Sequence, residues 1–392
     1  MSQETLKMSE RERRRAEVMR RHLRGEILLK EAAWEMNVSD RHARRIKKRF
    51  RQKGDEGLVH RGRDMPSNNG HSAEFRKKII NLYKDKYPDF GPTLACEKMM
   101  ELNVIKVAKE TLRRWLIAES LWRVGEKERV HRRKRKRRER FGDMLQIDGS
   151  DHAWLEDRGQ KATLMVMIDD ATGRIMLHMA REETTDAAMA LLEKWVRKHG
   201  VPDSIYADRR MVYFTEDYVH DKTRRKDPAV FTRFMHTTDR LGIDMIPAYS
   251  AQAKGRVERA NRTLQDRLVK ELRLLGINTI EAANAMLDSY AEKHNGEFAL
   301  APLRPANAHR TAPKGRRQRE YCFCYEETRK VQKDNTVVLK NEYWQILKQK
   351  NGPRPGDTVV QRSPLSGAEP YWVFGDQRLK TKSLGCERPK AA

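Results

Sequence analysis

Two short helical patterns near the start of the chain predict a helix-turn-helix. Residues 10–22 have the composition of a charged helix, and apolar positions recur at helical spacing in residues 28–36. Asn37 interrupts that pattern, and Ser39 is a suitable N-cap for a second helix over residues 40–50. The apolar positions of this second helix fall on one face and its basic positions on the other. We therefore expect it to pack on the preceding helix and to present a cationic surface.

A second helical unit with three helices is predicted for residues 72–122. Apolar positions at 79–82 mark its first helix, residues 90–93 form a turn that starts the second, and residues 112–122 supply the third. Residues 57–70, between the two units, are rich in Gly, Pro and Asn and predict a linker. Two small helical units in tandem suggest a bipartite binding site.

From residue 143 onward the spacing of apolar positions changes from helical to strand-like. Three successive strands joined by short turns, followed by strands that alternate with helices, are the element order of the ribonuclease-H-like fold. This fold is an α/β mixed sheet with helices on its faces. The expected elements are strands at 143–150, 163–172, 173–181, 203–208 and 244–250, and helices at 184–199, 228–241 and 254–275.

Short alternating segments close the chain and predict a small β-barrel or sandwich. The expected fold class is therefore multidomain, with all-α helix-turn-helix units, a central α/β ribonuclease-H-like mixed sheet and a C-terminal small β-barrel. The expected boundaries are a first helix-turn-helix domain at 1–66, a second helix-turn-helix-like domain at 72–123, a basic linker at 124–142, the ribonuclease-H-like core at 143–300, a second basic linker at 301–320 and the small β domain at 321–392.

Positive charge is concentrated in the N-terminal third of the chain. The 392 residues include 82 Lys and Arg against 56 Asp and Glu, and the net charge is +26. Residues 1–140 contain 40 basic and 21 acidic side chains. Such a field attracts polyanions, nucleic acid above all, although membrane headgroups attract it too. No apolar run approaches the roughly 18 residues that span a bilayer, and the N-terminus lacks a signal peptide, so we expect a cytoplasmic protein without a membrane partner.

The exposed basic residues predict contacts with double-stranded DNA. Basic side chains on the second helix of a helix-turn-helix reach base edges and phosphates when that helix lies in the major groove; an ordinary solvated helix is the alternative. Arginines of the following linker are suited to a minor groove, and the basic run at 131–140 is suited to the phosphate backbone. The predicted DNA-binding residues are Arg41, Arg44, Arg45, Lys48, Arg61, Arg63, Arg113, Arg114, Arg133, Arg135, Lys254, Arg256 and Arg262.

Three acidic residues of the core predict a catalytic metal site. Asp148 lies in the first expected strand, Asp208 ends the fourth, and Glu258 lies one turn into the long helix. A buried carboxylate is unfavourable unless it is paired or bound to a cation, and hard oxygen ligands prefer Mg²⁺ or Mn²⁺. Three carboxylates together can hold two such ions for phosphoryl transfer. For each acid alone an exposed turn or strand end is the favoured interpretation, and only the combination of the three on this element order favours the site.

The long helix carries a polar ridge beside its buried apolar stripe. Glu258 is at the head of this ridge, which continues with Asn261, Arg262 and Gln265. We expect the ridge to face the carboxylate site.

Nearly the whole chain resembles the DDE transposases of bacterial insertion sequences, and within them the ISNCY-type group, which have a retroviral-integrase-like catalytic core. The resemblance lies in the segments KEAAWEMNVSDRHARRIKKRFRQKGDEGLVHR, FGPTLACEKM, KETLRRWL, QIDGSDHAWLEDRG, LMVMIDDATGRI, IYADRRMVYF, AYSAQAKGRVERANRTLQDRL and KHNGEFALAP. It assigns the family's two Asp residues to Asp148 and Asp208 and its Glu to Glu258. Such families often have Gly or His two residues after the second Asp, whereas this chain has Arg210.

The resemblance implies a transposase that binds the terminal inverted repeats of an insertion sequence, cuts one strand at each end and joins the freed 3′-hydroxyl to target DNA. It also implies a homodimer or higher assembly on DNA, and a bacterial protein associated with the nucleoid. Arg210 keeps open a DNA-binding repressor or domesticated transposase with an inert core. A nuclease acting on RNA–DNA hybrids is the third candidate, although two DNA-binding units have no evident use in it.

Overall fold

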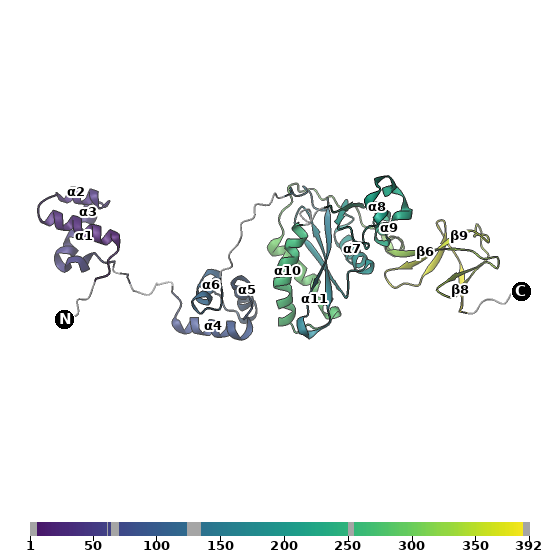
Figure 1. The fold of residues 1–392 in the computed structure, drawn as a ribbon, viewed down its shortest axis with the longest axis horizontal. Coiled ribbons are helices and arrows are strands. Elements are labelled where there is room, and N and C mark those ends of the chain that lie inside the picture. The colour runs from purple at the N-terminus through teal and green to yellow at the C-terminus, as the bar shows by residue number, and fades with distance from the viewer. Residues whose placement is uncertain (1–5, 61, 64–69, 124–134, 250–254, 387–392) are drawn as a thin grey trace. The chain divides into compact units, whose positions relative to one another are not determined.

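The computed structural model describes residues 6–60, 62–63, 70–123, 135–249 and 255–386, apart from the side chain of Lys222. The chain divides into two compact units, residues 1–124 and 125–392, and each is described by itself (Figure 1). None of the helices in the described ranges is both long and apolar enough to cross a bilayer.

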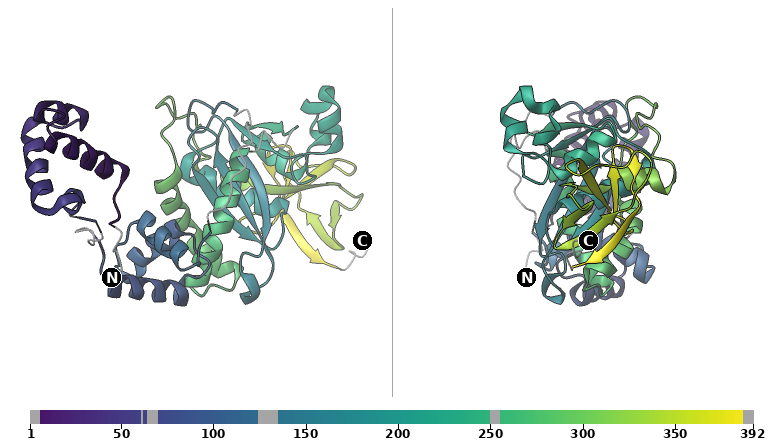
Figure 2. Two further views of the ribbon diagram at one scale, coloured as in Figure 1. Left: turned by 60° about the vertical axis from the view of Figure 1, so that its left-hand side comes forward. Right: turned by 90° about the vertical axis from the view of Figure 1, so that its right-hand side faces the viewer.

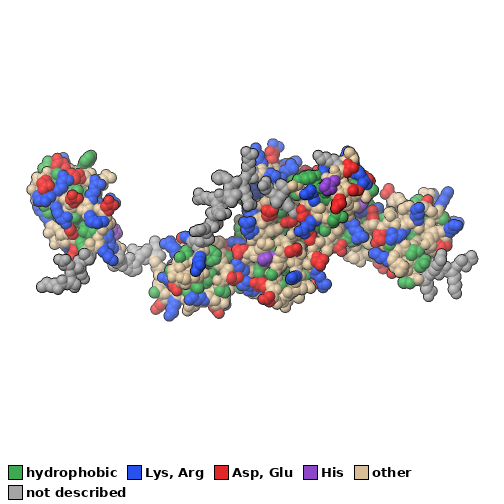
Figure 3. All heavy atoms as spheres, viewed as in Figure 1, with side chains coloured by type: hydrophobic (Ala, Val, Ile, Leu, Met, Phe, Trp, Pro, Cys, Tyr) green, Lys and Arg blue, Asp and Glu red, His purple; other side chains and the backbone are tan. Residues whose placement is uncertain are grey.

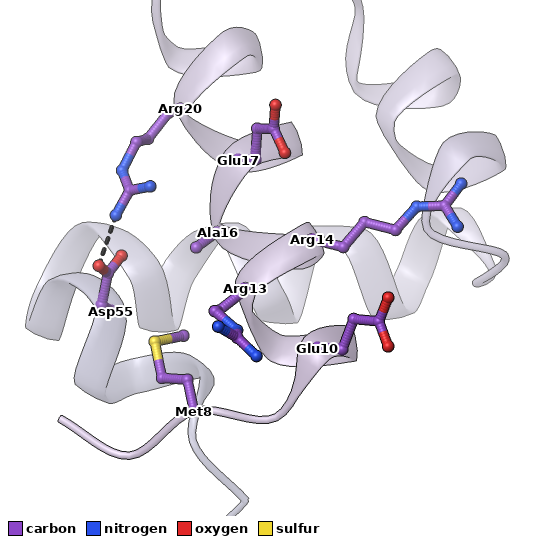
Figure 4. A pocket seen from close by; sticks show the side chains of 8 residues that line it. All are labelled: Met8, Glu10, Arg13, Arg14, Ala16, Glu17, Arg20 and Asp55. Atoms are coloured by element: carbon purple, nitrogen blue, oxygen red, sulfur yellow. Dashed lines mark hydrogen bonds and ion pairs between the residues drawn. The ribbon is translucent and has the colours of Figure 1, made fainter.

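The first helical group has the predicted helix-turn-helix. It consists of α1 (Glu10–Leu23), α2 (Leu29–Glu35) and α3 (Asp40–Lys53). Ser39 caps α3 as predicted, because its hydroxyl accepts a hydrogen bond from the His42 amide. A 3-10 turn (Gly54–Leu58) follows, and Asp55 of this turn pairs with Arg20 of α1 beside a hollow lined mainly by charged side chains (Figure 4). The apolar core between the elements includes Met19, Ala32, Ala33, Ala43, Ile46, Phe50 and Leu58.

The second helical group also agrees with the predicted elements. It consists of α4 (Ala73–Lys86), α5 (Pro92–Asn103) and α6 (Lys109–Ala118). Ser72 caps α4, and Pro92 occupies the first turn of α5, where its missing amide hydrogen costs no helical hydrogen bond.

The larger unit contains the predicted mixed sheet. Its five strands are β1 (Leu145–His152), β2 (Ala162–Asp169), β3 (Ile175–Ala180), β4 (Ser204–Ala207) and β5 (Asp244–Pro247). Their order in the sheet is β3-β2-β1-β4-β5. β1, β2 and β3 pair antiparallel, whereas β4 is parallel to both β1 and β5. In this register β4 ends beside the middle of β1, which continues to His152.

Helices cover both faces of this sheet, as expected (Figures 1 and 2). α7 (Thr185–His199) and α9 (Arg233–Arg240) pack on the face that carries Leu145 and Ile147 of β1. α10 (Gly255–Leu274) and α11 (Ile280–Phe298) pack on the opposite face. A short helix, α8 (Glu216–His220), lies between β4 and α9 in the chain. The predicted apolar stripe of α10 is buried, from Val257 to Leu272.

The C-terminal part is not the closed barrel that we predicted. Its elements are α12 (Gly315–Cys322), β6 (Cys324–Lys330), β7 (Thr336–Leu339), β8 (Glu342–Ile346), β9 (Thr358–Pro364), β10 (Tyr371–Phe374), β11 (Gln377–Arg378) and β12 (Thr381–Gly385). In the described residues the strands form two separate sheets, of orders β11-β10-β9-β6 and β12-β8-β7. Val337 and Leu339 of one sheet and Val359 and Trp372 of the other share one apolar core. The short strands bury this core by stacking two sheets rather than by closing one.

Candidate active site

The helix α10 lies along β1, and three hydrogen bonds fix the alignment of the two elements. Four residues of helix rise about 6 Å, and two residues of strand rise about 6.7 Å, so every fourth helical residue meets every second strand residue. The predicted polar ridge at Asn261 and Gln265 therefore faces the strand that carries Asp148. The three bonds run from Val257 N to Gln146 Oε1 (3.3 Å), from Asn261 Nδ2 to Asp148 Oδ2 (3.1 Å) and from Gln265 Nε2 to Ser150 Oγ (3.1 Å).

Asp148, in the middle of β1, and Asp208, directly after β4, come together where β4 ends. β1 and β4 are parallel neighbours in which Gln146 lies opposite Tyr206, and two further residues along each chain lead to Asp148 and Asp208. Arg210 lies beside Asp208, since its Nε is 3.2 Å from Asp208 Oδ2. The negative charges of Glu183 first, then of Asp208 and Asp148, raise the pKa of its guanidinium. The structure thus places two of the three predicted acids in one site.

A third carboxylate, that of Glu183, lies next to these two. Its side chain is only 7% exposed, accepts a 2.9 Å hydrogen bond from the Tyr213 hydroxyl and forms an ion pair with Arg210. Glu183 packs against the backbone beside Asp148, because a Cβ at Gly149 would lie 2.5 Å from Glu183 Oε2 and would displace this carboxylate. Burial, and then the negative charges of the two Asp residues, raise the pKa of Glu183. Glu183 has no distinctive signal in the sequence, since an acid directly before a helix N-cap is common.

Glu258, the third predicted acid, differs from Asp148 and Asp208 in its surroundings. It lies in the first turn of α10 and is exposed. Within the described ranges, which leave out residues 250–254 just before this turn, no three His, Cys, Asp or Glu side chains are arranged to hold a metal ion. The assignment of Glu258 to a metal site therefore stays a prediction.

The donor atoms around Asp148 nevertheless suit a divalent cation. Asn261 donates its amide NH₂ to Asp148, whereas its Oδ1 is buried and has no hydrogen-bond partner in the described part of the chain. An unsatisfied buried oxygen is costly, and oxygen donors are the ligands that Mg²⁺ and Mn²⁺ prefer. The carboxylates of Asp148 and Asp208 are thus of the donor type that suits a hard cation, and the neighbouring Asn261 carries a further oxygen without a partner in the described residues.

The predicted recognition helix α3 presents its basic side chains to solvent. Its three apolar positions, Ala43, Ile46 and Phe50, are buried against the neighbouring helices. Figure 3 shows Lys and Arg side chains interspersed with acidic ones on the surface of this group. The exposed residues of α3 include Arg41, Arg44, Arg45 and Lys48.

Other predicted DNA contacts of the N-terminal unit are bound to acids of the same chain. Arg63 forms an ion pair with Glu12, whose side chain is 7% exposed. Arg113 makes two hydrogen bonds to Glu110, and Arg114 Nε lies 3.8 Å from the same carboxylate. Arg61 lies outside the described residues.

In the larger unit, two of the predicted DNA-binding residues are likewise paired with an acid of the chain, and one is exposed. Arg135 and Arg256 both form ion pairs with Asp170, which is fully buried. Arg262 is exposed on α10. Arg133 and Lys254 lie outside the described residues.

Comparison with known proteins identifies relatives of this chain. Residues 14–64 match the helix-turn-helix domain family. The chain is 40% identical over 304 residues to the y4bF protein of Sinorhizobium fredii (strain NBRC 101917 / NGR234), which is named as a transposase; this match covers 77% of the chain and 65% of the relative. It is 29% identical over 311 residues to the transposase for insertion sequence IS1202 of Streptococcus pneumoniae, covering 70% of the chain and 65% of that protein.

The matched region thus spans just under two thirds of the length of both relatives. Among solved structures, the chain is similar to a simian T-cell lymphotropic virus intasome in complex with PP2A regulatory subunit B56 gamma, at a TM-score of 0.34 and 14% identity, covering 77% of this chain and 98% of that one. By sequence, this chain is a relative of transposases and carries a helix-turn-helix domain at residues 14–64.

Proposed function

We propose that this chain is a DNA transposase that binds the terminal inverted repeats of an insertion sequence and catalyses metal-dependent strand cleavage and strand transfer. The observation that carries the proposal is the position of Asp148 in the middle of β1, beside Asp208 at the end of the parallel neighbour β4 and next to Asn261 of α10. The sequence relationship to transposases supports the same conclusion.

The two helical groups supply DNA recognition in this proposal. α3 reads the transposon ends through its exposed basic residues, the second helical group contacts an adjacent part of the end, and the basic linker follows the backbone. Two ends must be brought together and joined to target DNA, so the chain acts as a homodimer or higher assembly on double-stranded DNA.

The carboxylates Asp148, Asp208 and Glu258 would hold two Mg²⁺ or Mn²⁺ ions. Bound divalent ions supply Lewis acidity and activate an attacking oxygen in phosphoryl transfer. Asn261 holds the Asp148 carboxylate in one orientation through its 3.1 Å hydrogen bond. The exposed Arg262, on the same ridge, is suited to bind a DNA phosphate. Each transesterification conserves the number of phosphodiester bonds, so the enzyme lowers the barrier by positioning the DNA and neutralising its charge.

The test compares Asp148→Asn with Asp151→Asn on the same strand. Duplexes from the two ends of the DNA that flanks the gene are incubated with protein and Mg²⁺, and nicked and joined products are resolved on a sequencing gel. We expect Asp148→Asn to lower cleavage at least 100-fold while end binding changes less than twofold. Asp151, an exposed residue whose carboxylate accepts a hydrogen bond from Thr163, should tolerate the same substitution. Equal loss of binding and cleavage in Asp148→Asn contradicts the proposed division of labour.

The second candidate is a DNA-binding repressor or domesticated transposase with an inert core. Its support is Arg210, whose guanidinium pairs with both Asp208 and Glu183 and so neutralises carboxylates at the site. Under this alternative the wild-type chain binds the ends but gives no cleavage with either Mg²⁺ or Mn²⁺.

A further inference from the structure

A buried carboxylate just after β2 joins three parts of the larger unit. Asp170 is 0% exposed and accepts hydrogen bonds from four groups. Two come from the basic segment before β1: the Arg135 guanidinium and the Arg138 backbone amide (2.8 Å). The other two are Gln146 Nε2 of β1 (2.8 Å) and Arg256 Nη1 of α10 (2.7 Å).

The first turn of α10 is held by Asp170 in two ways. Arg256 binds it directly, and Gln146 binds it indirectly, because the same buried side chain donates to Asp170 and accepts from the backbone amide of Val257. The Val257 amide belongs to the first turn of the helix, where amides have no partner within the helix, so Gln146 also satisfies a buried donor.

The same carboxylate fastens the end of the basic segment. Arg256 also donates through Nη2 to the backbone oxygen of Arg135 (2.9 Å), and Arg137 donates to the backbone oxygen of Ala171 (3.0 Å). The two guanidiniums that share Asp170 would repel each other without its charge. Loss of that charge should therefore loosen the basic segment and the first turn of α10 together.

We propose that Asp170 is a positioning residue that fixes the first turn of α10 against β1 and docks the basic segment at the same point. Gln146 lies two residues before Asp148, and Arg256 lies two residues before Glu258. Through these two residues, Asp170 sets the position of Glu258 relative to Asp148. The importance of this geometry for catalysis rests on the proposed function, but the geometry itself does not.

The experiment uses the full chain and three substitutions. Asp170→Asn keeps the shape of the side chain and removes its charge. Gln146→Met removes the hydrogen bonds of Gln146 to Asp170 and to the Val257 amide, while every charge is kept. Asp266→Asn is the control, since it removes the same charge from a side chain that is 59% exposed and pairs with Lys270 farther along α10. Thermal unfolding establishes that each variant is folded. Hydrogen exchange of residues 255–258 reports the first turn, and tryptic cleavage after Arg135 to Arg138 reports the basic segment.

We expect Asp170→Asn to accelerate exchange in residues 255–258 and cleavage at the basic segment at least tenfold, with less than a twofold change in the control. Gln146→Met should accelerate hydrogen exchange in residues 255–258 without faster tryptic cleavage. If Asp170→Asn does not fold, the exchange measured in Gln146→Met tests the proposal instead. Unchanged exchange in both folded variants, or faster tryptic cleavage with unchanged exchange, overturns the proposal. In the cleavage assay Asp170→Asn should lower kcat with end affinity kept within twofold. An inactive wild-type chain would contradict the proposed function alone, because exchange and proteolysis need no catalysis.

Discussion

Substitution of Arg44 and Arg45 by Ala tests the proposed recognition helix most directly. Both side chains are exposed on α3, while the neighbouring Ala43 and Ile46 are completely buried. The double substitution therefore removes two guanidiniums without opening a cavity, and alanine favours the helix. The helix-turn-helix should stay folded, so a change in DNA affinity can be attributed to the missing side chains.

The expected loss depends on what the two arginines contact. A side chain that reads a base edge contributes about 1–3 kcal/mol of discrimination, so two such contacts contribute about 2–6 kcal/mol. The lower figure corresponds to a roughly 30-fold weaker Kd for the end sequence. Two phosphate contacts would instead weaken binding to every sequence and lower the slope of log K against log salt by about 1.8.

Fluorescence anisotropy with end duplexes and shuffled duplexes, each over a salt series, separates these cases. The control is Arg316→Ala with Arg317→Ala on α12, which removes the same charge from two exposed helical positions in the other unit. We expect the α3 variant to lose at least 30-fold on end DNA and the control to lose less than threefold. Equal losses in the two variants would refute α3 as the recognition helix and leave only the general positive field.

Two further predictions concern acids whose pKa is displaced. Hydrogen bonds, first among them that of the Ser9 amide, lower the pKa of Glu12 to about 2, so its contribution to stability is present above pH 4.5 and is lost as the pH falls towards 2. Glu12→Gln should flatten the acid limb of a Tm-against-pH curve of the helix-turn-helix, and an unchanged limb contradicts this. Burial raises the pKa of Glu183, so its ionisation lowers stability as the pH rises. The Tm difference between Glu183→Gln and wild type should therefore increase from pH 4 to pH 8, and a constant difference would show that ionisation is not involved.

The elements that could be predicted from sequence are those whose apolar positions repeat regularly. α3 and α10 have one apolar stripe each, and the strands of the core sheet have distinct turns between them, so local spacing was sufficient. The polar ridge of α10 was predictable for the same reason, because Asn261 and Gln265 share a helical face that the apolar stripe leaves over. The proximity of Asp148 and Asp208 depends on the register of β1 with β4, which sets Gln146 opposite Tyr206.

Features that depend on distant contacts were not predictable. The sequence did not indicate α11, although it buries Ile280, Leu287 and Tyr290, because its other buried positions are two alanines, a histidine and an asparagine. The barrel prediction failed because short alternating strands suit both a closed sheet and two stacked sheets, and only strand pairing distinguishes them. Glu183 was not predictable, because its neighbours Gly149 and Tyr213 lie elsewhere in the chain.

Burial of the acidic partner separates the arginines that hold the fold together from those available to DNA. Arg63 and Arg256 pair with carboxylates that are 7% and 0% exposed, and an arginine that left such a partner for a DNA phosphate would strand a buried negative charge. The free-energy cost of the unpaired carboxylate offsets much of the binding free energy that a phosphate contact contributes. Arg44 and Arg45 are exposed and can bind DNA without breaking the core. Substitution of Arg256 should consequently lower stability more than DNA affinity, whereas substitution of Arg44 should lower DNA affinity more than stability. The sequence alone predicts DNA contacts for both residues and does not distinguish them.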